Sequence, residues 1–170
     1  MVVGSKNSIQ KRHNRLASIV VQDVRDRFPR AMILEDQIVQ LSYFENNSQP
    51  TQTPTVFEHT LPDLCVIDHV TRKCLIVEVS VPFDVFLNDC YQSKFNPYLP
   101  LCQAITEKGY DCKITVLIVG SLCSVHCRFV SGLRLIGIPT SRAKRIAKYC
   151  SVSAMIGSRI IWKQRCRSML

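Results

Sequence analysis

The sequence predicts an α/β fold in which helices flank a mixed β-sheet, followed by a basic helical C-terminal tail. Three observations predict this class: an amphipathic helix pattern near the N-terminus, several short Val- and Ile-rich runs after it, and helical stretches between and after those runs. Elements that alternate in this way are typical of a sheet that packs helices on its faces. The chain has 170 residues, which is enough for one domain with a hydrophobic core.

The first predicted element is a helix over residues 8–28, because Leu16, Val20 and other apolar residues recur there at helical spacing. Pro29 ends this helix, since proline cannot continue the backbone hydrogen bonds. His13 falls on the polar side of the helix. We therefore interpret His13 as a solvent-exposed residue rather than as a ligand.

Residues 31–41 predict a strand that is bent near Glu35 and Asp36. The segment that follows, over residues 42–59, is rich in Asn, Ser, Gln, Thr and Pro, a composition typical of a long loop. Two interpretations of this loop stay open. It contacts a substrate, or it only connects the elements on either side.

Residues 63–69 and 75–81 predict a β-hairpin, because a short polar turn joins two runs rich in Val, Ile and Leu. Asp68, at the far end of the first run, is interpreted as a turn residue. Glu78 lies inside the second run, on the same face as Ser80. An unpaired charge in an apolar strand is costly, so a partner must compensate it. A bound cation is the favoured partner, and a core-facing Arg or Lys is the alternative.

Residues 83–95, after the proline that ends this strand, predict a helix with Tyr91 and Lys94 on one face. Two prolines then break the helical pattern, because proline disrupts helix hydrogen bonding. The pattern resumes over residues 101–109 and ends at Gly109, a residue type common just after helices. These helices are expected to separate the hairpin from the next strand.

Residues 112–120 are strongly apolar, which predicts a central strand that is buried on both faces. The rest of the chain has helical tendency. A short helix is predicted over residues 126–136, and two further helical segments are predicted over 141–150 and 153–167. Apolar residues of the last two segments face inward, and their Lys and Arg residues face outward.

The net charge of +9 is distributed unevenly along the chain. Asp111 is the last acidic residue, whereas residues 112–170 contain eleven Lys and Arg. This asymmetry favours a polyanionic partner, nucleic acid before membrane, over a merely solvated basic face. No apolar run approaches the roughly 20 residues that span a bilayer, and the N-terminus lacks the apolar region of a signal peptide. We expect a nuclear or cytoplasmic protein that is neither secreted nor inserted in a membrane.

The chain contains nine cysteines, for which free thiols are the expected state in a reducing compartment. Most of them lie in apolar segments, where Cys acts as a small hydrophobic residue. The only tight cluster is formed by Cys123, His126 and Cys127. A structural zinc site needs four ligands, and no CxxC pair supplies the others. We therefore favour core packing over zinc binding for these three residues.

The Pro-Asp pair that ends at Asp63, followed after fourteen residues by Glu78, resembles the motif of the PD-(D/E)xK nucleases. The restriction-like endonucleases at the C-terminal end of non-LTR retrotransposon reverse-transcriptase polyproteins are more similar still. They continue into a helix that bears a lysine, here Lys94, and into a segment of the Tyr-x-Pro-Leu kind, which begins here at Tyr98. Residues 153–162 also look like the end of those polyproteins. The resemblance covers nearly the whole chain.

Two positions depart from the family pattern. Leu61 stands where the family often has a basic residue, and Ser80 stands at the position of the motif lysine. The family typically carries that lysine on the following helix, so the resemblance implies that Lys94 replaces it. It also implies an endonuclease-like core over residues 1–120 and a basic helical extension over 121–170, packed on the same domain. No reverse-transcriptase motif or zinc knuckle precedes this region, so we expect a C-terminal fragment or a degenerate copy of such an element.

The site residues that the resemblance implies are two carboxylates and a lysine. Asp63, Glu78 and Lys94 would be catalytic. Asp63, Glu78 and the backbone carbonyl of Val79 would bind Mg²⁺ or Mn²⁺, since these hard cations prefer oxygen ligands. Glu35 is a further acidic candidate on the preceding strand.

The function that the resemblance implies is a metal-dependent DNA endonuclease domain that nicks target DNA for retrotransposon integration. RNA would be a further partner through the parent polyprotein. The basic tail would hold the DNA backbone through contacts that do not depend on sequence. The candidate nucleic-acid-binding residues are Arg142, Lys144, Arg145, Lys148, Arg159, Lys163 and Arg165. Two alternatives stay open: a catalytically inactive nucleic-acid-binding remnant of the same fold, and a structure-selective nuclease of the resolvase type that acts as a dimer.

Overall fold

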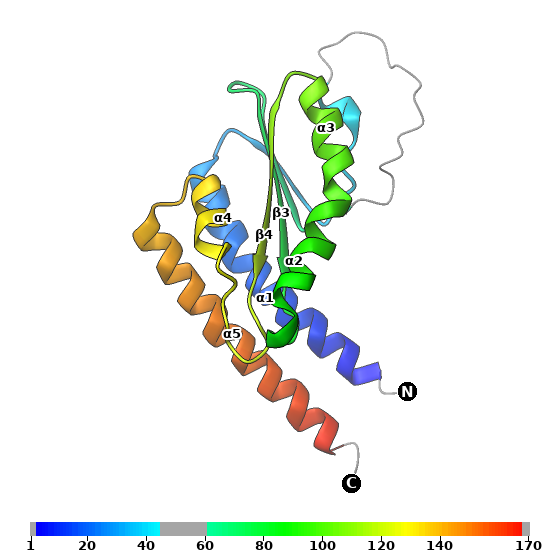
Figure 1. Cartoon of the computed structure of the whole chain (residues 1–170), viewed down its shortest axis with the longest axis vertical. Helices are drawn as coiled ribbons and strands as arrows, with labels where there is room; N and C mark the ends of the chain where they lie inside the picture. Colours follow the sequence, from blue (N-terminus) through cyan, green and yellow to red (C-terminus); the bar gives the residue numbers. More distant parts are fainter. Residues whose placement is uncertain (1–2, 45–60, 168–170) are drawn as a thin grey trace.

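The computed structural model of the chain describes residues 3–44 and 61–167. A four-stranded sheet lies between two layers of helices (Figure 1). In order across the sheet, the strands are β1 (Met32–Glu35), β2 (Leu64–Asp68), β3 (Lys73–Ser80) and β4 (Asp111–Ile118). The pairs β1–β2 and β2–β3 are antiparallel, whereas β3 and β4 are parallel. The predicted α/β class, with a mixed sheet flanked by helices, is therefore confirmed.

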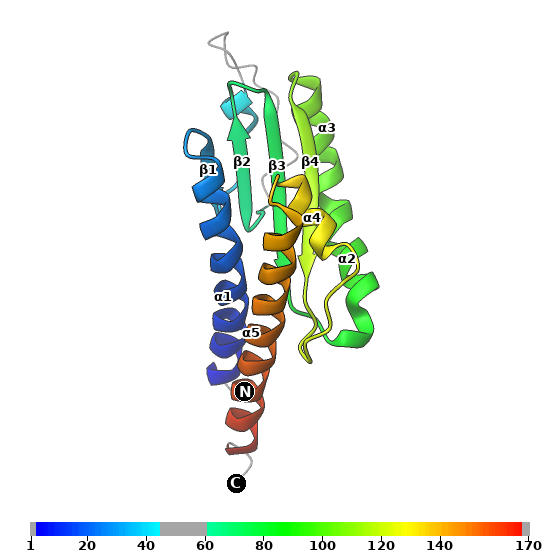
Figure 2. The same cartoon turned by 90° about the vertical axis from the view of Figure 1, so that its left-hand side faces the viewer.

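The helices form two layers, one on each face of the sheet. One face is covered by α1 (Val3–Arg27), α4 (Phe129–Leu135) and α5 (Thr140–Arg167) (Figure 2). The other face is covered by α2 (Leu87–Phe95) and α3 (Leu99–Glu107). Short 3₁₀ segments span Leu41–Phe44, Asp84–Phe86 and Asn96–Tyr98. The α2–α3 pair is the crossover that the parallel strands β3 and β4 require.

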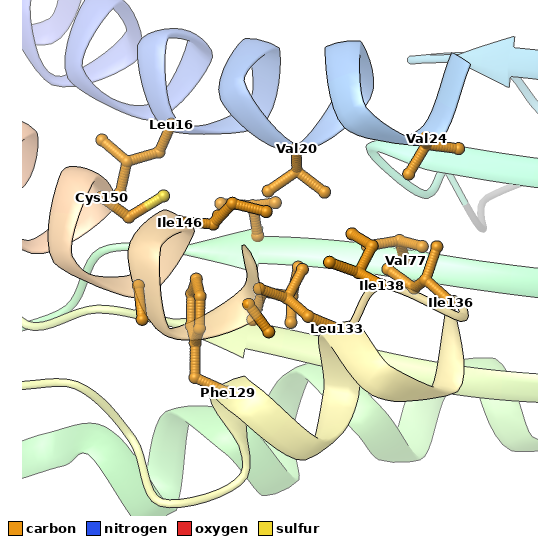
Figure 3. Close-up of a cluster of buried hydrophobic side chains, with 14 of the residues drawn as sticks. Leu16, Val20, Val24, Val77, Phe129, Leu133, Ile136, Ile138, Ile146 and Cys150 are labelled. Atoms are coloured by element: carbon orange, nitrogen blue, oxygen red, sulfur yellow. The ribbon is translucent and has the colours of Figure 1, made fainter. Parts of the chain in front are cut away.

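Alternate residues of β3 enter two separate hydrophobic clusters. Val77 and Val79 face the cluster that α1, α4 and α5 cover, shown in Figure 3. Cys74 and Ile76 face the opposite cluster, beneath α2 and α3. Glu78 shares this second face, because the side chains of a strand alternate between its two faces. The apolar character of β3 thus follows from helices on both sides of the sheet.

α1 and α5 lie side by side and run antiparallel (Figure 2). Arg142, near the start of α5, binds Asp23 toward the end of α1. At the other end of the pair, Nη1 of Arg12 donates to Oγ of Ser158 at 2.7 Å. Gly157 permits this approach, because a Cβ atom there would lie only 2.6 Å from Cγ of Arg12. The helix pair is therefore closely packed at the end where α1 begins and α5 ends.

α5 is one continuous helix, so the prediction of two segments over 141–150 and 153–167 is wrong. Its buried residues Ala143 and Ile146 belong to the same cluster as Leu16 of α1. Packing along the whole length of α1 explains why the helix continues, since tertiary contacts override weak local preferences. The two predicted parts of the chain, residues 1–120 and 121–170, consequently contribute to one hydrophobic cluster.

β1 is shorter than the strand predicted over residues 31–41. It ends at Glu35, because Asp36 adopts a left-handed backbone conformation with a φ of 48° that a strand cannot continue. The predicted bend is therefore a strand end. In the loop predicted over residues 42–59, residues 42–44 belong to a 3₁₀ turn that buries Phe44, and the rest lie outside the described residues.

β4 is an edge strand of the described sheet, so the central position predicted for residues 112–120 is wrong. Its residues from Ile114 to Ile118 are nevertheless buried. Helices α2 and α3 contact it on one face, and α4 contacts it on the other. The apolar run therefore reflects cover by helices on both faces rather than strand neighbours on both edges.

The predicted hairpin of β2 and β3 is confirmed, and Asp68, the last residue of β2, binds the turn that follows it. Its Oδ1 accepts hydrogen bonds from the backbone N–H groups of Val70 at 3.0 Å and Thr71 at 3.2 Å. The helical break at the two prolines is also confirmed, as is the end of α3 just before Gly109, which has a φ of 84°. No helix in the described parts of the chain is both long enough and apolar enough to cross a membrane.

Candidate functional site

The candidate site lies where β3 continues past the start of β2. Leu64, the first residue of β2, pairs with Val77, so the backbone of β3 extends beyond its partner strand from Glu78 on. The side chain of Asp63 takes the place of that partner. Its Oδ2 accepts a hydrogen bond from the N–H of Val79 at 2.6 Å. The Pro-Asp motif residue is thus fixed against the residue that follows the motif glutamate.

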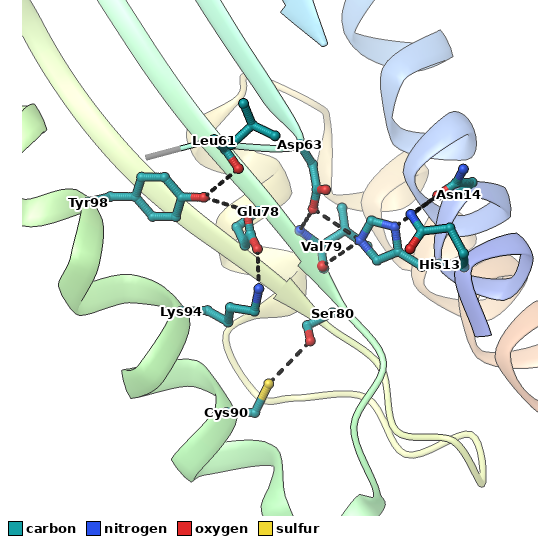
Figure 4. Close-up of polar contacts among 11 residues, drawn as sticks. His13, Asn14, Leu61, Asp63, Glu78, Val79, Ser80, Cys90, Lys94 and Tyr98 are labelled. Atoms are coloured by element: carbon teal, nitrogen blue, oxygen red, sulfur yellow. Dashed lines mark hydrogen bonds and ion pairs between the residues drawn. The ribbon is translucent and has the colours of Figure 1, made fainter. Parts of the chain in front are cut away.

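His13 reaches the same point from α1 (Figure 4). Its Nε2 lies 3.2 Å from Oδ2 of Asp63 and 3.0 Å from the carbonyl oxygen of Val79. Both neighbours are acceptors, so Nε2 must carry the proton. The hydrogen bond to Asp63 raises the pKa of His13 to about 9, although burial acts in the opposite direction. The prediction that His13 is solvent-exposed is therefore wrong.

Glu78 is only 4% exposed and is held at both carboxylate oxygens from the α2–α3 side (Figure 4). Nζ of Lys94 lies 2.7 Å from Oε1, and the hydroxyl of Tyr98 donates to Oε2 at 2.8 Å. Burial lowers the pKa of Lys94, but the hydrogen bond and charge of Glu78 outweigh it and raise that pKa. Burial, with the charge of Glu78, also raises the pKa of the Tyr98 hydroxyl.

The ion pair with Lys94 compensates the buried charge of Glu78. The sequence left two partners open for Glu78, a bound cation and a basic side chain. The structure shows the basic side chain, that of Lys94. Burial of Glu78 alone gives no argument for a bound cation. The structure shows instead that Glu78 lies next to the residue that binds Asp63. Glu78 directly precedes Val79, and the backbone N–H of Val79 donates to the carboxylate of Asp63. The negative charge of Asp63 also acts on the pKa of Lys94.

The structure brings four of the predicted site residues together and separates a fifth from them. Asp63, Glu78, Val79 and Lys94 meet at this end of β3. Glu35 does not join them, because its carboxylate accepts hydrogen bonds from the guanidinium of Arg25.

Ser80 stands at the position of the motif lysine and accepts a hydrogen bond from Sγ of Cys90 at 3.3 Å. Cys90 and Lys94 are one helical turn apart on α2. The face of α2 that carries Lys94 thus lies over the end of β3. This arrangement agrees with the expected displacement of the lysine onto the helix.

The donor set of this site suits a hard cation in its chemistry. Oδ2 of Asp63 and the carbonyl oxygen of Val79 converge on one point, since both lie within 3.2 Å of the same nitrogen. Oxygen ligands are those that Mg²⁺ and Mn²⁺ prefer. Among the described residues, however, no three His, Cys, Asp or Glu side chains form a cluster that could hold a metal ion. The backbone carbonyl of Val79 would have to act as one of the ligands.

The seven predicted nucleic-acid-binding residues all lie on α5 and are solvent-exposed. Arg142 is engaged by Asp23, with Nε 2.9 Å from Oδ2. Arg159 and Arg165 lie at the opposite end of α5, beside Arg12 of α1. Because Arg12 precedes His13, this second group lies close to the candidate site.

His126 is buried, as predicted, and its ring stacks on Tyr91 with 5.0 Å between the centroids. Its Nε2 also lies 3.0 Å from Oδ1 of Asn88, so two contacts tie it to α2. Cys123 and Cys127 are exposed, so the core-packing prediction is wrong for them. The segment that carries them faces solvent, which sequence spacing does not reveal. His126 helps to fix the helix that carries Lys94.

His13 is the residue of this site that sequence reasoning missed. The periodicity of α1 correctly places it away from the apolar stripe, but that side of the helix meets the end of the sheet rather than solvent. No signal within the helix itself reveals this contact, because Asp63 is 50 residues away.

No protein-family model matches the chain, and a search of curated proteins finds no match either. The resemblance to the restriction-like endonucleases therefore remains a prediction from the sequence.

Proposed function

We propose that this chain is a metal-dependent DNA endonuclease domain with a PD-(D/E)xK core, of the kind carried by non-LTR retrotransposon polyproteins. One observation carries the proposal: the residues selected by the motif spacing meet at one end of β3. Asp63 is bound to the backbone of Val79, and Lys94 is bound to Glu78, the residue before it. The antiparallel hairpin, followed by a helical crossover to a parallel strand, supports the same proposal.

Asp63, Glu78 and the carbonyl of Val79 would hold Mg²⁺ or Mn²⁺. Such a cation neutralises charge on the scissile phosphate and lowers the pKa of a water ligand. His13 would release Asp63 and Val79 when the cation binds, because its Nε2–H contacts both oxygens. The N–H of Val79 would keep the carboxylate of Asp63 oriented throughout.

Lys94 is the residue that would act on the reacting groups. Its side chain is 45% exposed, so its ammonium is accessible from solvent while Glu78 anchors it. From this position it would orient the attacking water or stabilise negative charge that develops on the phosphate. Tyr98 is a positioning residue, since it holds the second oxygen of Glu78.

Nicking of supercoiled plasmid by the purified chain in Mg²⁺ or Mn²⁺ tests this function. We expect the wild type to produce nicked circles, and Asp63→Ala and Glu78→Ala to produce none above background. Circular dichroism establishes that both variants are folded. Nicking that persists in both variants would contradict the proposal.

A nucleic-acid-binding domain of the same fold without catalysis is the second candidate. Ser80 at the motif-lysine position favours it, as do the partners that already hold both carboxylates, His13 for Asp63 and Lys94 for Glu78. DNA binding without cleavage in either cation would support this candidate. Preferential cutting of four-way junctions would instead favour a nuclease of the resolvase type.

A further inference from the structure

A cavity of about 390 Å³ lies between α1, α5 and the segments that follow β3 and β4. Its lining is mostly apolar and includes two aromatic side chains, Phe83 and Trp162. These are 66% and 67% exposed, which is high for large aromatic residues. The volume falls within the range typical of small-molecule sites. The cavity is therefore large enough for a planar ring between or beside these two side chains.

Two buried polar atoms belong to residues that line this cavity. Ser121 is 5% exposed, and neither its Oγ nor the Nε of Arg12 has a hydrogen-bond partner among the described residues. A buried polar group without a partner is costly, and most such groups in folded proteins are satisfied. Both atoms are fully buried, however, so they lie beneath the wall of the cavity and do not contact its contents.

The charge of the lining indicates an anionic ligand. Arg12, Arg159 and Arg165 line the cavity, and none of its described lining residues is acidic. A ligand that matches both features has an aromatic ring for Phe83 and Trp162 and a negative group for the guanidiniums. A nucleotide within a nucleic-acid strand has both.

The cavity is adjacent to the candidate site. Nη2 of Arg12 donates to the carbonyl of Val81 at 3.0 Å, and both of these residues line the cavity. Arg12 precedes His13 in α1, and Val81 is two residues beyond Val79. The cavity and Lys94 therefore both lie near the end of β3, the cavity on the side of α1 and α5 and Lys94 on the side of α2.

We propose that the cavity receives an unpaired base of the bound strand, either single-stranded or turned out of a duplex. The base stacks on Trp162 or Phe83, and Arg159 and Arg165 contact the flanking phosphates. Stacking on aromatic side chains with cationic residues alongside is how proteins hold unpaired bases. This inference rests on the proposed function for its substrate class, and it makes unpaired DNA the preferred ligand.

Trp162 is the only tryptophan in the chain, so its fluorescence reports on this cavity directly. The full-length chain is titrated in EDTA with oligothymidylate and with an abasic oligomer of the same length and charge. We expect oligothymidylate to quench Trp162 saturably and the abasic oligomer to bind about tenfold more weakly without quenching, as loss of one stacked base predicts.

Phe83→Ala tests the same cavity by a readout that does not use tryptophan. In anisotropy titrations with labelled oligomers, this variant should weaken oligothymidylate binding about tenfold and leave abasic binding unchanged. Tyr149→Leu is the matched control, because Tyr149 is a 60% exposed aromatic residue elsewhere on α5. It should change neither titration. Both exposed positions tolerate substitution without loss of folding.

Equal affinity and equal quenching for the two oligomers would overturn the proposal. So would a Phe83→Ala variant that changes self-association in sedimentation but not DNA binding, since the cavity would then hold a second copy. These titrations contain no divalent cation, so their outcome is separate from that of the nicking assay. Absence of nicking with normal base-dependent quenching would refute the nuclease function alone.

Discussion

At the scale of single residues, the chemistry centres on the carboxylate of Glu78. It is buried, and each of its oxygens has its own partner, Lys94 or Tyr98. Lys94 therefore has two roles that experiments must separate: it compensates a buried charge, and it is the proposed catalytic lysine. Loss of a partner at a buried charged group is more damaging than removal of both partners.

Lys94→Met should lower the free energy of unfolding by about 1–3 kcal/mol, because Glu78 loses its ammonium partner. Adding Glu78→Gln should recover part of this loss, since the buried charge disappears while Tyr98 keeps an acceptor. Urea unfolding followed by circular dichroism measures both changes. A double variant that is less stable than Lys94→Met would show that the ion pair does not hold Glu78.

His13 predicts a pH dependence of stability when divalent cations are removed with EDTA. Its pKa rises from 6.5 to about 9 on folding, through the hydrogen bond with Asp63 against the effect of burial. The folded chain thus keeps a proton that the unfolded chain releases, so the stabilisation is complete below pH 6.5 and lost as pH rises through about 9. His13→Gln should remove this component in urea titrations at several pH values. An identical profile in wild type and variant would contradict the contact.

The motif correctly predicted that Asp63, Glu78 and Lys94 lie close together, and the reason is local. Asp63 directly precedes β2, Glu78 lies on β3, and a short turn joins the two strands, so the spacing fixes their proximity. Lys94 lies on α2, the next helix along the chain, on a face that the register of that helix defines. His13 lies beyond such reasoning, because its contact depends on where α1 crosses the sheet. Helical periodicity distinguishes the apolar side of a helix from its polar side. It does not show whether the polar side faces solvent or the end of a strand.

At the scale of elements, the packing of α1 against α5 positions both the site and the cavity. Sequence reasoning placed a break at residues 151–152 of α5, which are Ser and Val, residues of lower helix propensity than alanine. In the structure Ser153 is buried, and Oγ of Ser151 donates to the carbonyl of Cys123 at 2.7 Å. Tertiary contacts of this kind keep the helix intact. They cannot be predicted from the sequence around residue 151 alone.

Gly157→Ala tests the close approach of the two helices. Helix propensity alone would make alanine stabilising by about 1 kcal/mol. We expect the opposite sign, a loss of about 1–3 kcal/mol, because the new Cβ would lie 2.6 Å from Cγ of Arg12. Thermal or urea unfolding measures it, and the substitution should cost less in an Arg12→Ala background. A stabilised single variant would contradict this packing.

At the scale of the whole molecule, the basic residues that gather toward the C-terminal end of the sequence form a cationic surface along α5. All seven candidate nucleic-acid-binding residues are exposed on the single helix α5, where the sequence predicts two helical segments. Arg142 is held by Asp23, 119 residues away, and this pairing is invisible in the sequence. The layers of the sheet follow the hydrophobic pattern, whereas the edge position of β4 depends on strand order, which the pattern does not encode.

Salt dependence of DNA binding tests this distribution of charge. Each lysine or arginine that contacts a phosphate of duplex DNA contributes about 0.9 to the slope of log affinity against log salt concentration. Arg145→Gln should reduce the slope by about that amount, whereas Arg142→Gln should change it little because Asp23 already engages that guanidinium. Anisotropy titrations at several NaCl concentrations measure both. A larger effect of Arg142→Gln would contradict the assignment.

The central claim is that Asp63, Glu78, Val79 and Lys94 form one metal-dependent nuclease site, and nicking by Lys94→Met tests it most directly. Lys113→Met is the matched control, because Lys113 is an exposed lysine paired with Asp111 on β4. With wild-type nicking established in Mn²⁺, we predict that Lys94→Met, folded at the assay temperature, nicks at least about 100-fold more slowly. Lys113→Met should nick at the wild-type rate. Undiminished nicking by folded Lys94→Met would contradict the claim.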